Sequence, residues 1–183
     1  MRSFALLAVT GALLSLVGCG YHTLGSSANL PPAVHTLAVP IFRNGTQSYH
    51  TELTITQAVV REFNDRTRLT VVSGERGDAA DARLSGTIVS ESVQPLTYKT
   101  ATTTSIAGTN SGFTSSFLIT INANVVLTDR NNRILYQHQN YVFHEQYETT
   151  SDLASFIQED SPAVERLSRD FAQALVGDIL ESF

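Results

Sequence analysis

The chain contains very little cysteine, lysine or tryptophan. Of its 183 residues one is cysteine, Cys19, and none is tryptophan. A single cysteine cannot form an internal disulfide, so a folded domain must be held together by its core. Lysine occurs once, at Lys99, and acidic residues outnumber basic ones by 17 to 12. A net charge of −5 argues against a protein that binds nucleic acid through its overall field.

Catalytic motifs are missing as well. The sequence contains no phosphate-binding glycine loop, no nucleophile elbow and no HExxH motif. His138 and His144 are six residues apart on a predicted strand, which separates them by about 20 Å at roughly 3.3 Å per residue. They are therefore too far apart to bind one metal ion. We expect no catalytic residue, no metal site and no cofactor, and we do not expect an enzyme.

The N-terminal residues are typical of a bacterial lipoprotein signal. Arg2 precedes an apolar run over residues 4–17, and Gly18 stands directly before Cys19. The run is shorter than the roughly 20 residues that span a bilayer, and it ends at a cleavage pattern. We therefore predict a signal peptide at residues 1–18 and lipidation of Cys19, whose acyl chains would hold the protein on a membrane. The alternative is an ordinary secretory signal with a chance cysteine.

The residues after Cys19 indicate where the protein resides and how it is organised. Gly20 stands where aspartate would favour retention in the inner membrane, so we expect an outer-membrane anchor and a periplasmic domain. Residues 19–33 are rich in Gly, Pro and Ser and predict a lipidated tether. Residues 34–183 then predict a single domain.

Hydrophobic periodicity in this domain predicts four strands and two helices. The strands are expected at 34–42, 82–98, 117–128 and 134–147, and the helices at 48–66 and 161–183. Residues 69–72 form only a short extended piece, and the 82–98 strand is expected to break near 90–92. These elements predict an α+β fold, a two-layer sandwich with two helices packed on one face of a mixed four-stranded sheet.

Local signals also set the expected C-terminal helix. Ser161 and Pro162 have the residue types of an N-cap and a first helical position. Residues 152–158 before them predict a separate helical turn. Gly177 weakens the helix by roughly 1 kcal/mol relative to alanine and is expected to allow close packing on the sheet.

The strand predicted at 117–128 has one apolar and one polar face. Its apolar side chains alternate with Thr120, Asn122, Asn124 and Thr128, which would face water or another protein. Residues 99–116 before it are rich in Ser and Thr, and predict a loop or the tip of a long β-arm.

Three stretches resemble one family. The first is Cys19-Gly20-Tyr21-His22 followed by Gly25. The second is Leu30-Pro31-Pro32, followed by HTLAVPIF at 35–42 and Asn44-Gly45-Thr46; the third is VREF at 60–63 leading into RTRLTVV at 66–72. The chain is similar to the LptE family of lipopolysaccharide-assembly lipoproteins. The resemblance implies a non-enzymatic protein that plugs the LptD β-barrel of the outer membrane, helps it assemble, and assists delivery of lipopolysaccharide to the outer leaflet.

Two candidate sites follow from this resemblance and from the predicted elements. The polar strand face of Thr120, Asn122, Asn124 and Thr128 suits the polar lumen of a barrel. Lipopolysaccharide phosphates would be bound by Arg or Lys, and Lys99, Arg130 and Arg133 lie at predicted loop tips. Solvated turns are the alternative for these three cations. The alternative function is a periplasmic lipoprotein that acts as a scaffold or pilot for another envelope complex.

Overall fold

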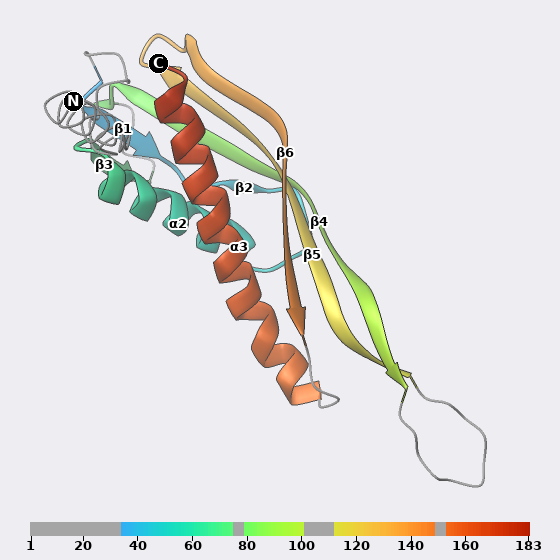
Figure 1. Cartoon of the computed structure of the whole chain (residues 1–183). Coiled ribbons are helices and arrows are strands. Elements are labelled where there is room, and N and C mark those ends of the chain that lie inside the picture. Colours follow the sequence, from blue (N-terminus) through green and yellow to red (C-terminus); the bar gives the residue numbers. More distant parts are fainter. Residues whose placement is uncertain (1–33, 75–78, 101–111, 149–152) are drawn as a thin grey trace, which may run out of the picture.

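A six-stranded sheet carries two helices on one face (Figure 1). The computed structural model describes residues 34–74, 79–100, 112–148 and 153–183. The predicted signal, the tether and Cys19 lie outside these residues. The elements are β1 (Thr36–Val39), β2 (Arg43–Asn44), α2 (Thr51–Arg66), β3 (Thr70–Ser73), β4 (Ala82–Thr100), β5 (Gly112–Asp129), β6 (Ile134–Glu148) and α3 (Leu153–Glu181).

The sheet is mixed, as predicted, but it has six strands and not four. Its order is β3-β1-β4-β5-β6, and β2 pairs with β4 off this path. β1 is parallel to β3 and to β4, whereas β4, β5 and β6 are antiparallel. The strand predicted at 34–42 is shorter, because β1 ends at Val39, directly before Pro40, which lacks an N–H for the ladder. The short extended piece at 69–72 becomes β3, because β1 provides a partner strand for it.

The predicted start of the C-terminal helix at Ser161 is wrong. α3 is continuous from Leu153 to Glu181, with Pro162 inside it. A proline inside a helix removes one hydrogen bond and costs about 3 kcal/mol. Packing of the following turns on the sheet offsets this cost, because Leu167 and Phe171 are at most 1% exposed. The predicted separate turn at 152–158 is therefore part of α3.

The core lies between the two helices and the sheet. Most of the apolar residues that predict the two helices are buried in one cluster with those of the sheet, whereas Phe183 at the C-terminal end is 41% exposed. Gly86 of β4 leaves room for the ring of Phe42, which meets the ring of Phe171 edge-on at 6.3 Å. The fully buried members of the core include Ile55, Val59 and Phe63 of α2, Leu167, Phe171 and Leu175 of α3, and Ile119, Ile121, Ala123, Val125 and Leu127 of β5.

The β4–β5 hairpin extends beyond the two helices (Figure 1). The break predicted near 90–92 is replaced by a bulge, because Ile88 pairs with Ala123 and Ser90 with Asn122, which leaves Val89 as an extra residue. β4 is therefore continuous, and the residues on either side of Val89 alternate in opposite phase. The far part of the hairpin forms the β-arm that the Ser/Thr-rich sequence left open, although residues 101–111 lie outside the described part.

Candidate binding surface

The two helices leave the opposite face of the sheet uncovered (Figure 1). The four strand residues predicted to form a polar face all lie on it, because β5 has no extra residue between Leu118 and Thr128. The register places side chains from both neighbouring strands beside them. The face comprises Arg83, Ser85, Thr87, Ser90, Ser92 and Gln94 of β4, Ser116, Leu118, Thr120, Asn122, Asn124, Val126 and Thr128 of β5, and Ile134, Gln137, Val142, His144, Gln146 and Glu148 of β6.

This uncovered face is polar but carries almost no charge. Among its described members just named, Arg83 at one end and Glu148 at the other carry a full charge, and the residues between them are uncharged. The glutamates at the same level of the sheet point to the helix side. Glu91 lies opposite the buried Ile121, and the Glu145 Oε1 atom lies 2.6 Å from the Nε of Arg166 in α3. The face therefore offers neutral hydrogen-bonding groups in a chain whose net charge is negative.

Three asparagines form a connected group at the centre of this face. Asn140 has a left-handed backbone (φ 60°) at a bulge of β6, and its N–H donates to the Asn124 side-chain oxygen at 2.9 Å. The Asn122 amide donates to the side-chain oxygen of Asn140. Asn140 was missed in the sequence, although asparagine tolerates left-handed backbone better than most residues. The Asn122 Oδ1 atom is buried without a hydrogen-bond donor in the described structure.

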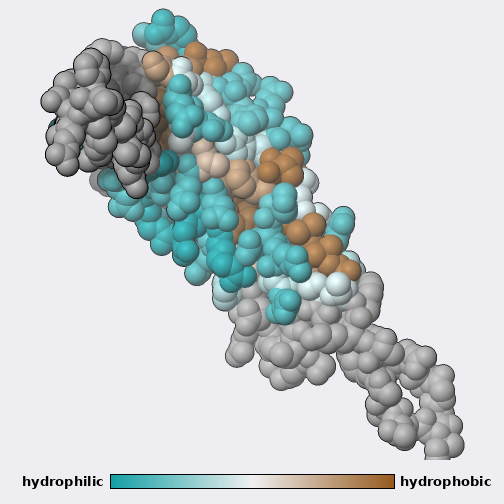
Figure 2. Space-filling view, in the orientation of Figure 1, coloured by the Kyte–Doolittle hydropathy of each residue, from teal (hydrophilic) through white to brown (hydrophobic). Residues whose placement is uncertain are grey.

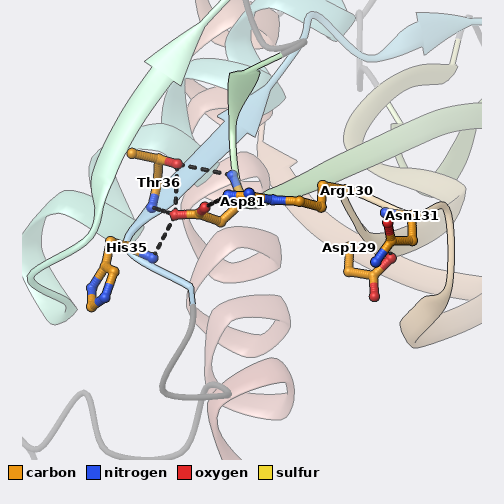
Figure 3. Close-up of polar contacts among 6 residues, drawn as sticks. All are labelled: His35, Thr36, Asp81, Asp129, Arg130 and Asn131. Carbon is orange, nitrogen blue, oxygen red and sulfur yellow. Dashed lines mark hydrogen bonds and ion pairs between the residues drawn. The ribbon is translucent and has the colours of Figure 1, made fainter.

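Arg130, one of the predicted lipopolysaccharide contacts, is paired with Asp81 (Figure 3). The Asp81 carboxylate also accepts hydrogen bonds from the His35 N–H, the Thr36 N–H and the Thr36 hydroxyl, each at 2.9 Å. These donors, the His35 N–H first, hold the pKa of Asp81 well below its usual range. Asp81 was not predicted, because its partners are 45 or more residues away in the sequence.

Arg133 lies on the same β5–β6 turn and is also beside a carboxylate. Its Nε atom is 3.3 Å from the Asp129 Oδ2 atom, and its side chain is 76% exposed. The backbone N–H of Arg133 is the main cause of a lowered pKa at Asp129, and the Asn131 N–H adds to it. Both arginines of this turn therefore face solvent with a carboxylate as neighbour.

Lys99 lies at the opposite end of the hairpin. It pairs with Phe113 near the start of β5, whereas Arg130 follows the last residue of that strand. At about 3.3 Å per residue the two ends are roughly 50 Å apart. The structure does not bring the three predicted cations together, and the Lys99 side chain lies outside the described part.

The helix side of the molecule is different in character. Its described surface is largely hydrophilic, with separate hydrophobic groups between polar ones (Figure 2). The Tyr141 hydroxyl donates to Asp178 of α3, and burial, then Asp178, raises the pKa of this tyrosine. Within the described ranges, no His, Cys, Asp and Glu side chains gather in threes to hold a metal ion. None of the described helices combines the length and the apolar character needed to cross a membrane.

Three solved lipoprotein structures are similar to this chain over most of its length. A lipoprotein of solved structure from Caulobacter crescentus CB15 is 11% identical, with a TM-score of 0.49 over 76% of this chain and 88% of its own. A minor lipoprotein from Acinetobacter baumannii is 7% identical, with a TM-score of 0.46 over 81% of this chain and 94% of its own. Rare lipoprotein B from Shewanella oneidensis is 9% identical, with a TM-score of 0.43 over 79% and 95%.

The sequence comparison gives the family. A search of curated proteins found no match to this chain. The family model of LptE, described as lipopolysaccharide-assembly, matches residues 34–179, which is well over half of the sequence and nearly all of the described domain. This chain therefore belongs to the LptE family of lipopolysaccharide-assembly proteins.

Proposed function

We propose that the protein is a non-enzymatic outer-membrane lipoprotein, anchored by acyl chains on Cys19. In this proposal its domain plugs an LptD-like β-barrel, helps that barrel assemble and assists delivery of lipopolysaccharide to the outer leaflet. The anchor would keep the domain close to the barrel and so raise its effective concentration there. The supporting observation is the neutral polar face of the sheet, which the helices leave uncovered.

The chemistry of this face suits a barrel lumen. The interior of an outer-membrane barrel is polar, so a plug must offer hydrogen bonds rather than an apolar patch. Hydroxyl and amide side chains such as Thr120 and Asn124 provide both donors and acceptors. Because the carboxylates at this level are directed to the helix side, binding through the face would bury few charges without a partner.

A matched pair of charge substitutions tests this proposal. Asn124 is exposed on the uncovered face and Gln173 is exposed on α3, so Asn124→Glu and Gln173→Glu add the same charge to opposite sides. Each tagged lipoprotein would be purified from detergent-solubilised outer membrane, and co-purifying proteins would be identified by mass. We expect a large β-barrel at about one-to-one ratio with the parent chain and with Gln173→Glu.

Asn124→Glu should lose most of the barrel, because an unpaired charge buried at an interface costs about 2–5 kcal/mol. Equal barrel recovery with both variants would show that the face is not the contact. Recovery of the parent chain alone, or with another envelope complex, would reject the plug and favour a scaffold or pilot lipoprotein.

Contact with lipopolysaccharide is part of the same proposal, and the geometry divides it into two tests. Lys99→Glu changes one end of the hairpin and Arg133→Glu changes the other. Because one phosphate group cannot meet both side chains, we expect one of the two variants to lower lipopolysaccharide binding and the other to leave it unchanged. Unchanged binding in the two variants, and in the triple reversal that includes Arg130, would reject these cations as contacts.

A further inference from the structure

β4 has an open edge beyond the point where its neighbours end. On the side away from β5, it pairs with β1 at Ala82 and Arg83 and with β2 at Thr87 and Ile88. From Ser90 to Gln94 its pairing with β5 is regular, and no other described strand pairs with this stretch. Five residues span about 17 Å. Their outward main-chain groups form a row of donors and acceptors that is open to water and matches the main chain of a further extended strand.

The direction of these main-chain groups follows from two observations. The Gly45 N–H donates to the Ile88 carbonyl at 2.9 Å, so the main-chain N–H and C=O groups of Ile88 point away from β5. The extra residue Val89 then shifts the alternation by one, so that the main-chain groups of Glu91, Val93 and Pro95 point toward the open edge. Pro95 agrees with this assignment, because a proline in a sheet is tolerated where its missing N–H would face an open edge.

The side chains along this edge are unusually apolar for exposed positions. Val89 is 46% exposed, Val93 43% and Leu96 45%. Open edges in natural proteins are commonly protected by lysine or other charges. Glu91 is the one charged residue between Val89 and Leu96. The irregularities at Val89 and near Leu96 bound a regular stretch that contains Ser90–Gln94 and ends at Pro95.

Glu91 adds a polar requirement to this edge. Its Oε2 atom is buried and has no hydrogen-bond donor in the described structure. In the neighbouring cross-strand pair, Asn122 of β5 lies opposite Ser90 of β4, and the Asn122 Oδ1 atom also lacks a donor. Two buried acceptors without donors therefore lie at one level of the sheet, one on each face. A buried acceptor left without a donor is costly, so this level of the sheet is incompletely satisfied within the described structure.

We propose that Ser90–Gln94 of β4 is a strand-addition site that binds an extended segment of the partner barrel protein. The segment pairs with the main chain of Glu91 and Val93 and covers the exposed valines with apolar side chains. This inference rests on the proposed function for the identity of the partner. It goes beyond that function because it assigns a second contact, at the sheet edge, with its own geometry and sequence preference.

The barrel protein fits this edge better than a second copy of the chain. Ser90, Ser92 and Gln94 direct their side chains to the uncovered face, so the edge continues the surface proposed to meet the barrel. A partner lying on that face reaches the edge without a second binding orientation. Pairing two copies through five residues would bury far less than the 1,200–2,000 Å² of a typical stable interface.

Photo-crosslinking in the native outer membrane tests the site. A photoreactive amino acid would replace Val93 at the edge, Val142 on the uncovered face, or Arg169 on α3 in the full-length lipoprotein. Val142 is 49% exposed and matches Val93 closely. We expect crosslinks to the same barrel protein from Val93 and Val142 and none from Arg169. Peptide mapping of the Val93 product should identify one extended segment with apolar side chains.

The possible results separate this inference from the proposed function. A barrel crosslink from Val142 without one from Val93 would overturn the edge site and leave the barrel contact in place. A crosslink from Val93 to a second copy of the chain would overturn the inference in favour of self-pairing. No barrel crosslink from either position would reject both proposals.

A proline substitution tests the main-chain pairing itself. Val93→Pro removes an outward N–H and should leave the β4–β5 ladder intact, whereas Val93→Thr keeps the N–H and the branched shape. We expect about 2- to 10-fold weaker barrel retention for Val93→Pro and nearly normal retention for Val93→Thr. Thermal unfolding of both variants would be measured in parallel. Full retention by a folded Val93→Pro protein would refute strand addition.

Discussion

Replacing Gly86 with alanine should destabilise the domain through one specific clash. A Cβ atom at this position would lie 2.3 Å from two ring atoms of Phe42 and 2.6 Å from a third. Phe42 is 2% exposed, and its ring lies edge-on to that of Phe171, so it has little room to withdraw. Overpacking of this kind costs about 1–3 kcal/mol. For a domain of this size each 1 kcal/mol lowers Tm by roughly 2–4 °C.

The assay is thermal unfolding followed by circular dichroism, with Gly177→Ala as the matched control. The same added methyl at Gly177 would meet only the Arg66 Nη1 atom at 3.5 Å, an ordinary contact. The expectation that Gly177 allows close packing on the sheet is therefore wrong, because this glycine faces α2. Alanine there should raise stability by about 0.5–1 kcal/mol, since glycine is a poor helix former.

The double variant Gly86→Ala with Phe42→Leu makes the reasoning specific. If the loss arises from the Phe42 ring, the two substitutions together should cost less than the sum of their separate costs. Strict additivity would refute the clash as the cause. An unchanged Tm in Gly86→Ala would show that the ring can move, and would contradict the tight packing described between β4 and α3.

Three further predictions concern stability. The pKa of Asp81 is held below its usual 3.8, chiefly by the His35 N–H, so the stabilising contribution of this carboxylate is complete above about pH 5 and is lost as the pH falls below 3.8. Asp81→Asn should therefore lower Tm at neutral pH and make Tm decline less in acid than it does in the parent chain. Parallel declines of Tm in acid for the variant and the parent would contradict this. Tyr141→Phe should cost about 1 kcal/mol in urea unfolding, because it removes the hydrogen bond to Asp178 and leaves the ring packing in place; an unchanged midpoint would mean that the bond contributes nothing. Cys19→Ala with the signal segment replaced should keep the far-ultraviolet circular dichroism of a folded domain, because the core lies within residues 34–179, and an unfolded spectrum would make folding dependent on the lipid.

The elements that the sequence predicts best are those with a strong repeat. β5 alternates without interruption from Leu118 to Thr128, and α2 repeats its apolar residues every four positions, so the faces of both elements follow from period alone. The predicted polar residues of β5 consequently lie together on one face. The residues 161–162 show the limit of such local signals, because Ser-Pro has the residue types of a helix start but lies inside a longer helix.

The sequence by itself determined the element types, the two faces of β5 and the family resemblance of this chain. Only the tertiary structure decided that β3 joins the sheet, that Asp81 pairs with Arg130 across 49 residues, and that Val89 turns Glu91 and Val93 toward an open edge. The reason is that periodicity depends on neighbours along the chain. Strand partners, bulges and buried acceptors depend on segments that meet only after folding.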